Sequence, residues 1–168
     1  MRSDRNMEIV KDLPNKVITI IRYFDADPEQ VWRAWTESAL LDIWWAPKPY
    51  RAETILHDFR NGGHWLYAMV GPDDSRIYAR ADYSDIENGK SFRVADSFCD
   101  ENGEAETGFP GMKWYNQFIQ DEQGTKVIVE IHFKDEDTLN SIIEMGFQEG
   151  FTAAMSNLDL YLKTQFRN

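Results

Sequence analysis

The chain has 168 residues, a formal net charge of -11 and a sequence pI near 4.7. Its length suits a single domain with a core of its own, and its negative charge, without a basic patch, argues against nucleic acid as a partner. The single cysteine, Cys99, cannot form an intrachain disulfide. The N-terminal residues lack the apolar run of a signal peptide, and no segment approaches the roughly 20 apolar residues of a membrane span. We therefore expect a cytoplasmic protein without a membrane span.

The N-terminal residues 1–14 are polar and end at Pro14. This composition predicts a flexible leader ahead of a single domain that occupies residues 15–168. The domain begins with KVITIIRYF at 16–24, a short segment rich in β-branched residues that predicts a strand.

Two short helices are predicted after this strand. Asp27, Pro28 and Gln30 have the order of an N-cap, a first-turn proline and a capping-box partner. A second helix follows and ends before Pro47, because proline cannot continue a helix.

Residues 50–133 have an alternating apolar pattern, which is interrupted by turn sequences at 61–63, 71–74, 87–89, 100–111 and 121–124. These interruptions predict six antiparallel strands joined in sequence. After Asp137 the apolar residues return to helical spacing and predict one long amphipathic helix, which contains Gly146 and Gly150. This helix is the element large enough to cover the apolar face of the sheet.

The order of these elements resembles the helix-grip fold of the START- and Bet v-like superfamily (SRPBCC). The motifs PEQVWRAWTESALLDIWWAP, DFRNGGHWLYAM, DYSDI, GTKVIVEIHF and GFQEGFTAAMSNLDLYL resemble, more narrowly, the family of the activator of the heat-shock-protein-90 ATPase, in its single-domain bacterial form. The most specific part of this resemblance is the pair Trp44 and Trp45 before Pro47, with Asp58, Arg60, Gly62 and Gly63 downstream.

The resemblance implies an α+β fold, in which a curved antiparallel sheet wraps around a long C-terminal helix and two short helices follow the first strand. It also implies a hydrophobic cavity between the sheet and that helix. A minority of members activate a chaperone, and the family shares no reaction.

Large side chains predicted to face inward are the candidates for the cavity wall. Five of the six tryptophans lie between Trp32 and Trp65, more rings than a small core needs. The expected ligand-binding residues are Trp44, Trp45, Trp65, Tyr67, Met69, Asp96, Phe98, Trp114, Asn116, Phe118, Phe147 and Phe151. The alternative is that the same rings interlock as a solid core. Within the tryptophan pair, we expect Trp44 to pack under the last helix and Trp45 to lie nearer the opening.

Two of these candidates, Asp96 and Asn116, are polar. Asn116 alternates regularly with Trp114 and Phe118, which predicts that it faces inward. A register shift of one residue would turn Asp96 to solvent, and we favour that interpretation. If Asp96 faces inward instead, its pKa should be raised, and it could act as an acid, a base or a ligand anchor.

The sequence predicts no metal site, no cofactor and no catalytic residue. His57, His64 and His132 do not have the spacing of a zinc site, and no serine, cysteine or lysine has the neighbours that a nucleophile needs. Asp58 and Arg60 are expected to form an ion pair that steadies a turn.

The function we expect is binding of a small hydrophobic or amphipathic molecule between the sheet and the C-terminal helix. A second hypothesis is a domain that docks on a chaperone and modulates its ATPase. A third is a cavity enzyme of the cyclase or hydrolase type, with Asp96 as the acid and Asn116 as the orienting group. The identity of the ligand and the oligomeric state stay open.

Overall fold

The structure is a computed structural model that describes residues 7–105 and 111–166. The elements in chain order are β1 (Met7–Asp12), β2 (Val17–Phe24), α1 (Pro28–Thr36), α2 (Ser38–Trp44), β3 (Arg51–His57), β4 (His64–Val70), β5 (Arg76–Glu87), β6 (Ser91–Cys99), β7 (Met112–Asp121), β8 (Gly124–His132), α3 (Glu136–Glu144) and α4 (Phe147–Phe166).

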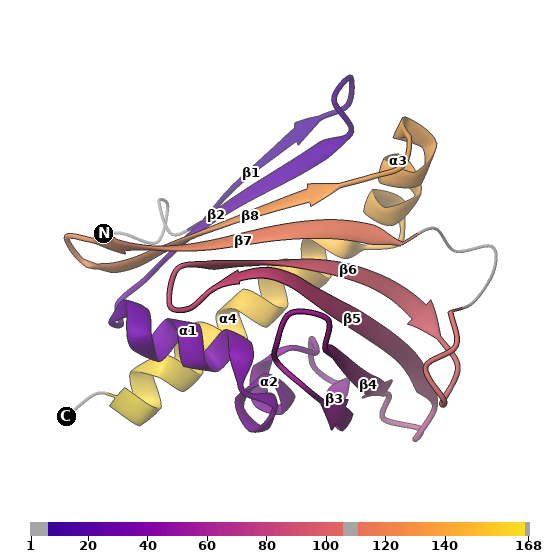
Figure 1. The fold of residues 1–168 in the computed structure, drawn as a ribbon, viewed down its shortest axis with the longest axis horizontal. Coiled ribbons are helices and arrows are strands. Elements are labelled where there is room, and N and C mark those ends of the chain that lie inside the picture. Colours follow the sequence, from indigo (N-terminus) through magenta and orange to yellow (C-terminus); the bar gives the residue numbers. More distant parts are fainter. Residues whose placement is uncertain (1–6, 106–110, 167–168) are drawn as a thin grey trace.

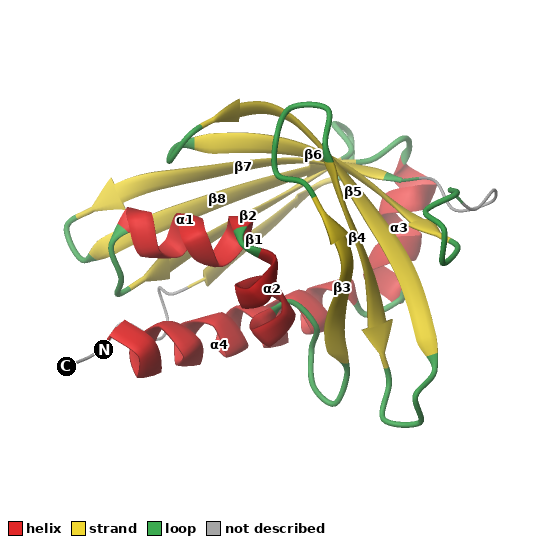
Figure 2. Ribbon diagram, turned by 60° about the horizontal axis from the view of Figure 1, so that its bottom comes forward, coloured by secondary structure: helices red, strands yellow, loops and turns green. Residues whose placement is uncertain are grey.

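All the described strands belong to one antiparallel sheet in the order β1-β2-β8-β7-β6-β5-β4-β3. The sheet is strongly curved, and α4 runs along its concave side (Figures 1 and 2). The predicted first strand and the six-stranded meander are confirmed as β2 and as β3 to β8. The predicted helix-grip architecture is therefore confirmed.

The expected flexible leader is wrong for residues 7–12, because they form β1. This strand pairs with β2 from Met7↔Arg22 to Asp12↔Val17, and the side chains of Met7 and Ile9 pack against the core. The edge of β2 offers unpaired backbone groups, which a neighbouring segment satisfies by adding a strand. Residues 1–6 lie outside the described part of the chain.

The two short helices are confirmed. The Gln30 Oε1 atom accepts a hydrogen bond from the Asp27 N–H at 3.1 Å, as a capping box requires. Helix α1 buries Trp32 and Trp35, and α2 packs against both β3 and α4. Its last residue, Trp44, is fully buried and donates its indole N–H to the carbonyl of Ala34 at 2.9 Å.

The predicted single C-terminal helix is wrong, because it is divided into α3 and α4. Gly146 has a φ of +93°, a left-handed conformation that favours glycine and ends a helix. Gly150 does lie inside α4, where the nearest atom to a Cβ at that position would be Pro47 Cγ at 3.8 Å. Close packing therefore does not require this glycine. Among the described helices, none combines the length and apolar composition needed to cross a bilayer.

Most of the N-terminal tryptophans belong to a packed core and do not line a large cavity. Trp32 makes edge-to-face contacts with Phe92 at 5.7 Å and with Phe118 at 5.2 Å, and Trp35 packs on Trp44 at 5.0 Å. The expectation that the tryptophan-rich segment forms a cavity wall holds for Trp45 alone among its helical tryptophans. The core alternative describes the others correctly.

Candidate ligand-binding pocket

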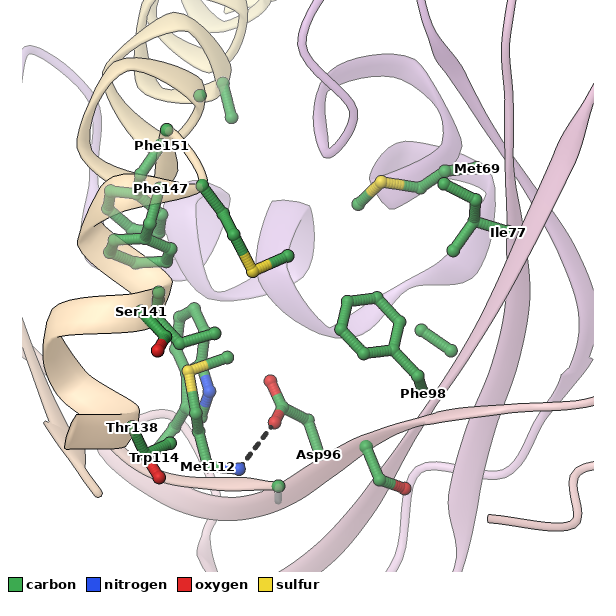
Figure 3. Close-up of a pocket in the computed structure, with 18 of the residues that line it drawn as sticks. Met69, Ile77, Asp96, Phe98, Met112, Trp114, Thr138, Ser141, Phe147 and Phe151 are labelled. Carbon is green, nitrogen blue, oxygen red and sulfur yellow. Dashed lines mark hydrogen bonds between the residues drawn. The ribbon is translucent and has the colours of Figure 1, made fainter. Parts of the chain in front are cut away.

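A cavity of about 600 Å³ lies between the concave face of the sheet, α3 and the first turns of α4 (Figure 3). Its volume falls within the roughly 300–1,000 Å³ typical of small-molecule sites. Most of the lining side chains are apolar. The lining residues are Trp45, Pro47, Tyr67, Met69, Ile77, Ala79, Asp96, Ser97, Phe98, Gly111, Met112, Trp114, Asp135, Asp137, Thr138, Ser141, Ile142, Met145, Gly146, Phe147, Gly150, Phe151 and Ala154.

The structure brings most of the predicted site residues to this pocket. Those that line it are Trp45, Tyr67, Met69, Asp96, Phe98, Trp114, Phe147 and Phe151. Trp65 and Asn116 line instead a separate small cavity of about 30 Å³. Trp44 and Phe118 line neither cavity, because both rings are enclosed by neighbouring aromatic residues of the core. Their prediction as ligand-binding residues does not agree with this placement.

The floor of the pocket comes from the pleat of three neighbouring strands. Tyr67 on β4 is opposite Ala79 on β5, and Ala79 is opposite Phe98 on β6. Side chains that are directly opposite each other point to the same face of a sheet. The small side chain of Ala79 between two large rings leaves space on this face, and this space belongs to the pocket.

An arc of aromatic rings joins the sheet to the helices. The Trp114 ring on β7 lies 6.0 Å from Trp45 and 6.0 Å from Phe151, and Phe151 stacks on Phe147 at 5.5 Å. The indole N–H of Trp45 donates to the hydroxyl of Tyr67 at 3.0 Å. These contacts fix the rings in place, so the apolar wall exists before any ligand enters.

Asp96 faces the pocket, and the expectation that it points to solvent is therefore wrong. The register across β5, β6 and β7 is regular at this point, with Ala81↔Asp96 and Asp96↔Met112, so no bulge reverses the face. Its Oδ1 atom accepts a hydrogen bond from the Met112 N–H at 3.0 Å (Figure 3). Burial raises the pKa of Asp96 to about 6, while the Met112 N–H and the nearby Trp114 indole oppose the rise.

Buried polar atoms without a partner occur at the pocket wall and in the small cavity beside it: Trp114 lines both, and Asn116 lines the small cavity only. Within the described residues, the buried Trp114 Nε1 and Asn116 Oδ1 atoms make no hydrogen bond; the Trp114 N–H lies close enough to Asp96 to affect its pKa, but it does not meet the geometry of a hydrogen bond. Asn116 is buried, as predicted from its alternation. A buried polar atom without a partner is costly, and a bound molecule could supply the missing partner.

Helix α3 supplies lining residues that the sequence interpretation missed. Thr138, Ser141 and Ile142 line the pocket from this helix, and Met145 does so from its C-cap position. The prediction of one continuous helix concealed them, because α3 is a separate helix that ends before the break at Gly146. The sequence signal was available, since a glycine after a helical stripe is a common C-terminal signal.

The remaining candidates have structural roles. His57 Nε2 lies 3.2 Å from the Tyr83 hydroxyl, and His132 lies 3.3 Å from Glu130 on the exposed face. Arg60 Nε donates to Asp58 at 2.7 Å in an exposed ion pair. No group of three or more metal-binding side chains occurs among residues 7–105 and 111–166.

This architecture defines the class of the protein: a curved antiparallel sheet that wraps a long C-terminal helix and encloses a cavity is the helix-grip fold of START-like proteins. The chain belongs to the family described as Activator of Hsp90 ATPase homolog 1-like protein, whose sequence profile matches residues 25–163. The predicted family is thus confirmed. No curated protein matches the chain.

Solved structures of bacterial proteins are similar to the chain over nearly its full length. Protein Ms6760 from Mycobacterium smegmatis is 26% identical, with a TM-score of 0.85 over 92% of this chain and 95% of that one. A protein from Arthrobacter aurescens is 27% identical, with a TM-score of 0.88 over 94% and 91%. A Staphylococcus epidermidis protein, at 24% identity and a TM-score of 0.83 over 95% and 96%, shares the fold.

Proposed function

We propose that this protein binds a small hydrophobic or amphipathic molecule in the pocket between the sheet, α3 and α4. The observation that carries the proposal is the open space itself. Folded interiors are closely packed, and cavities much larger than a water molecule are few. A cavity of about 600 Å³ bordered by apolar side chains is costly unless something fills it.

Two features of the wall indicate what kind of molecule this is. The rings of Trp45, Trp114 and Phe98 offer an apolar surface for a hydrophobic body. A few polar groups accompany them, with Asp96 on the sheet and Ser141 on α3 (Figure 3). An apolar wall with a few polar groups is typical of sites that orient an amphipathic ligand. A cytoplasmic location is part of this proposal.

The test is binding of the uncharged fluorescent probe N-phenyl-1-naphthylamine. We expect its emission to rise on binding and to saturate at one probe per chain. Ala79→Phe should fill the space between Tyr67 and Phe98 and weaken binding at least about tenfold, as loss of roughly 1.4 kcal/mol would do.

Ala95→Phe is the matched control, because Ala95 is exposed on β6 and does not line the pocket. It should leave the affinity for the probe unchanged. An equal affinity of Ala79→Phe and the parent protein, or absence of saturable binding by any apolar compound in a broad screen, would contradict the proposal.

A second proposed function is docking on a chaperone of the Hsp90 class, which the family description names. An exposed apolar surface supports it: Ile55 and Leu56 on β3 are about half exposed, as is Ile43 on the neighbouring α2. Strand β3 is also an edge of the sheet, and edge strands offer backbone groups for pairing with another chain.

Addition of the protein to the cognate chaperone should change the ATPase rate of the chaperone, and Leu56→Lys should abolish that change. An unchanged rate with the parent protein would exclude this function.

A further inference from the structure

We propose that the pocket selects cationic amphiphiles, that is, hydrophobic molecules that carry a protonated amine or a quaternary ammonium group. This inference rests on the proposed binding function and specifies the chemical class of the ligand. Three observations carry it: the signs of the charges that line the pocket, the position of the Asp96 carboxyl group, and the aromatic rings around it.

The charged residues that line the pocket all carry the same sign. They are Asp96, Asp135 and Asp137, and no lysine, arginine or histidine lines it among the described residues. Lys16 and Lys134 lie near Asp135 and help to lower its pKa, but neither borders the cavity. A pocket with low-dielectric walls and charges of one sign attracts ligands of the opposite sign and repels those of the same sign. Fatty acids and other carboxylates are therefore poor candidates.

The Asp96 carboxyl group is placed to receive a cation. One oxygen accepts the Met112 N–H at 3.0 Å, and the other points into the cavity (Figure 3). An ionised carboxylate that is removed from water needs a partner charge or several hydrogen-bond donors. A protonated amine at this oxygen would donate a charge-assisted hydrogen bond, which is stronger than a bond from a neutral donor. A quaternary ammonium group has no N–H and would be attracted to the carboxylate by charge alone.

Aromatic rings complete the recognition site. The Trp114 indole lies next to the Asp96 carboxyl group and affects its pKa, while Trp45 and Phe151 each lie 6.0 Å from the Trp114 ring. The faces of aromatic rings attract cations, and rings grouped around a small space recognise quaternary ammonium groups in this way. The adjacent Phe98 and Met69 can cover the apolar tail (Figure 3).

The competing ligand class is neutral. The unpartnered Trp114 Nε1 is a donor, so it could serve the hydroxyl or carbonyl oxygen of an uncharged molecule. The experiment must therefore separate charge from apolar binding. Decylamine, decyltrimethylammonium, decanol and decanoate have the same chain and differ in the head group.

We would measure their dissociation constants by isothermal titration calorimetry at pH 7.5, below the critical micelle concentration of each. Decylamine and decyltrimethylammonium should bind about tenfold more tightly than decanol, which is the ratio that 1.4 kcal/mol gives. Decanoate should bind more weakly than decanol. At pH 5.0 the advantage of the amine should shrink, because protonated Asp96 has no charge to offer. Tyr67, which also lies near Asp96, stays neutral at both values because burial raises its pKa. Hydrogen bonds from Thr138 lower the pKa of Asp135, so this carboxylate keeps its charge at pH 5.0.

Asp96→Asn is the decisive variant, because the amide oxygen can still accept the Met112 N–H. It should bring the affinities for decylamine and decanol together and leave the affinity for decanol itself within about twofold. Asp85→Asn is the matched control. It also removes one negative charge, but Asp85 lies on the outer surface of β5 beside Arg93 and does not line the pocket. It should keep the preference for the amine.

The outcomes distinguish the two proposals. If decanol binds and the cations bind no more tightly, the inference about ligand charge is wrong while the binding function stands. The same holds if the preference survives Asp96→Asn. If neither the four compounds nor N-phenyl-1-naphthylamine binds, both proposals are wrong. If N-phenyl-1-naphthylamine binds and none of the four compounds does, only the inference about ligand charge is wrong.

Discussion

Trp45 donates its indole N–H to the hydroxyl of Tyr67 at 3.0 Å, and this bond joins the end of α2 to the middle of β4. Both residues line the pocket. The bond therefore links the segment that precedes Pro47 to the floor of the cavity, and it fixes the ring of Trp45 at the pocket wall. Because burial raises the pKa of Tyr67, its hydroxyl stays neutral over the physiological range.

Trp45→Phe and Tyr67→Phe should each destabilise the protein by about 1 kcal/mol, since each leaves one member of the bond without its partner. The double variant should cost less than the sum, with a coupling energy of roughly 0.5–1.5 kcal/mol. Urea denaturation of the three variants measures these values. Strict additivity would show that the bond contributes nothing to stability.

The neighbouring tryptophans should respond differently to truncation. Trp44 is fully buried and bonded to Ala34, so Trp44→Ala should cost about 3–5 kcal/mol of unfolding free energy. Trp45→Ala should reduce binding of N-phenyl-1-naphthylamine more than it reduces stability, because this ring borders the pocket. Equal losses of stability for both variants, with unchanged probe affinity for Trp45→Ala, would mean that the pair is core only.

Stability should depend on pH through Asp96. Its pKa is raised from 3.8 to about 6 in the folded state, so the folded protein binds the proton more tightly than the unfolded chain. Its contribution to stability is complete below about pH 4 and is lost as the pH rises through 6. The change in unfolding free energy caused by Asp96→Asn should therefore be more favourable at pH 7.5 than at pH 4.

The upper limit of this effect is about 3 kcal/mol, from 1.36 kcal/mol for each pKa unit. Because the carboxyl group borders an open pocket, we expect about 1–2 kcal/mol after solvent screening. Urea denaturation across pH 4–8 measures it for the parent protein and the variant. A difference between the two proteins that does not change with pH would contradict the shift.

The two glycines near the helix break should give changes of opposite sign. Gly146→Ala should cost about 1–2 kcal/mol, because alanine is strained at a φ of +93°. Gly150→Ala should stabilise α4 by about 0.5–1 kcal/mol, since the added Cβ meets only Pro47 Cγ at 3.8 Å. Thermal denaturation of both variants checks the signs. Destabilisation by Gly150→Ala would show that this position needs glycine for packing.

Most of the secondary structure could be predicted from local sequence patterns. Alternation in β2 and in the strands from β3 to β8, the capping pattern around Asp27 and the helical stripe after Asp137 are local signals, because the period of the side chains depends on the backbone of one segment. The motifs shared with the family were enough for the fold. The strand at residues 7–12 was not predicted, because its pairing with β2 depends on a free sheet edge and not on the composition of these residues.

Which residues border the pocket could not be predicted in the same way, because it depends on how distant segments pack together. Trp44 and Trp45 are adjacent in sequence, yet Trp44 belongs to the core and Trp45 lines the cavity. Neighbouring residues on a helix point about 100° apart, so the packing of α2 against the rest of the protein buries one ring and leaves the other at the pocket. The orientation of Asp96 depended on the register of three strands, which no single segment contains. The place of α3 depended on the turn at Gly146. A cavity is the space left between elements, so the sequence names its candidate walls while the packing of the elements decides which of them face it.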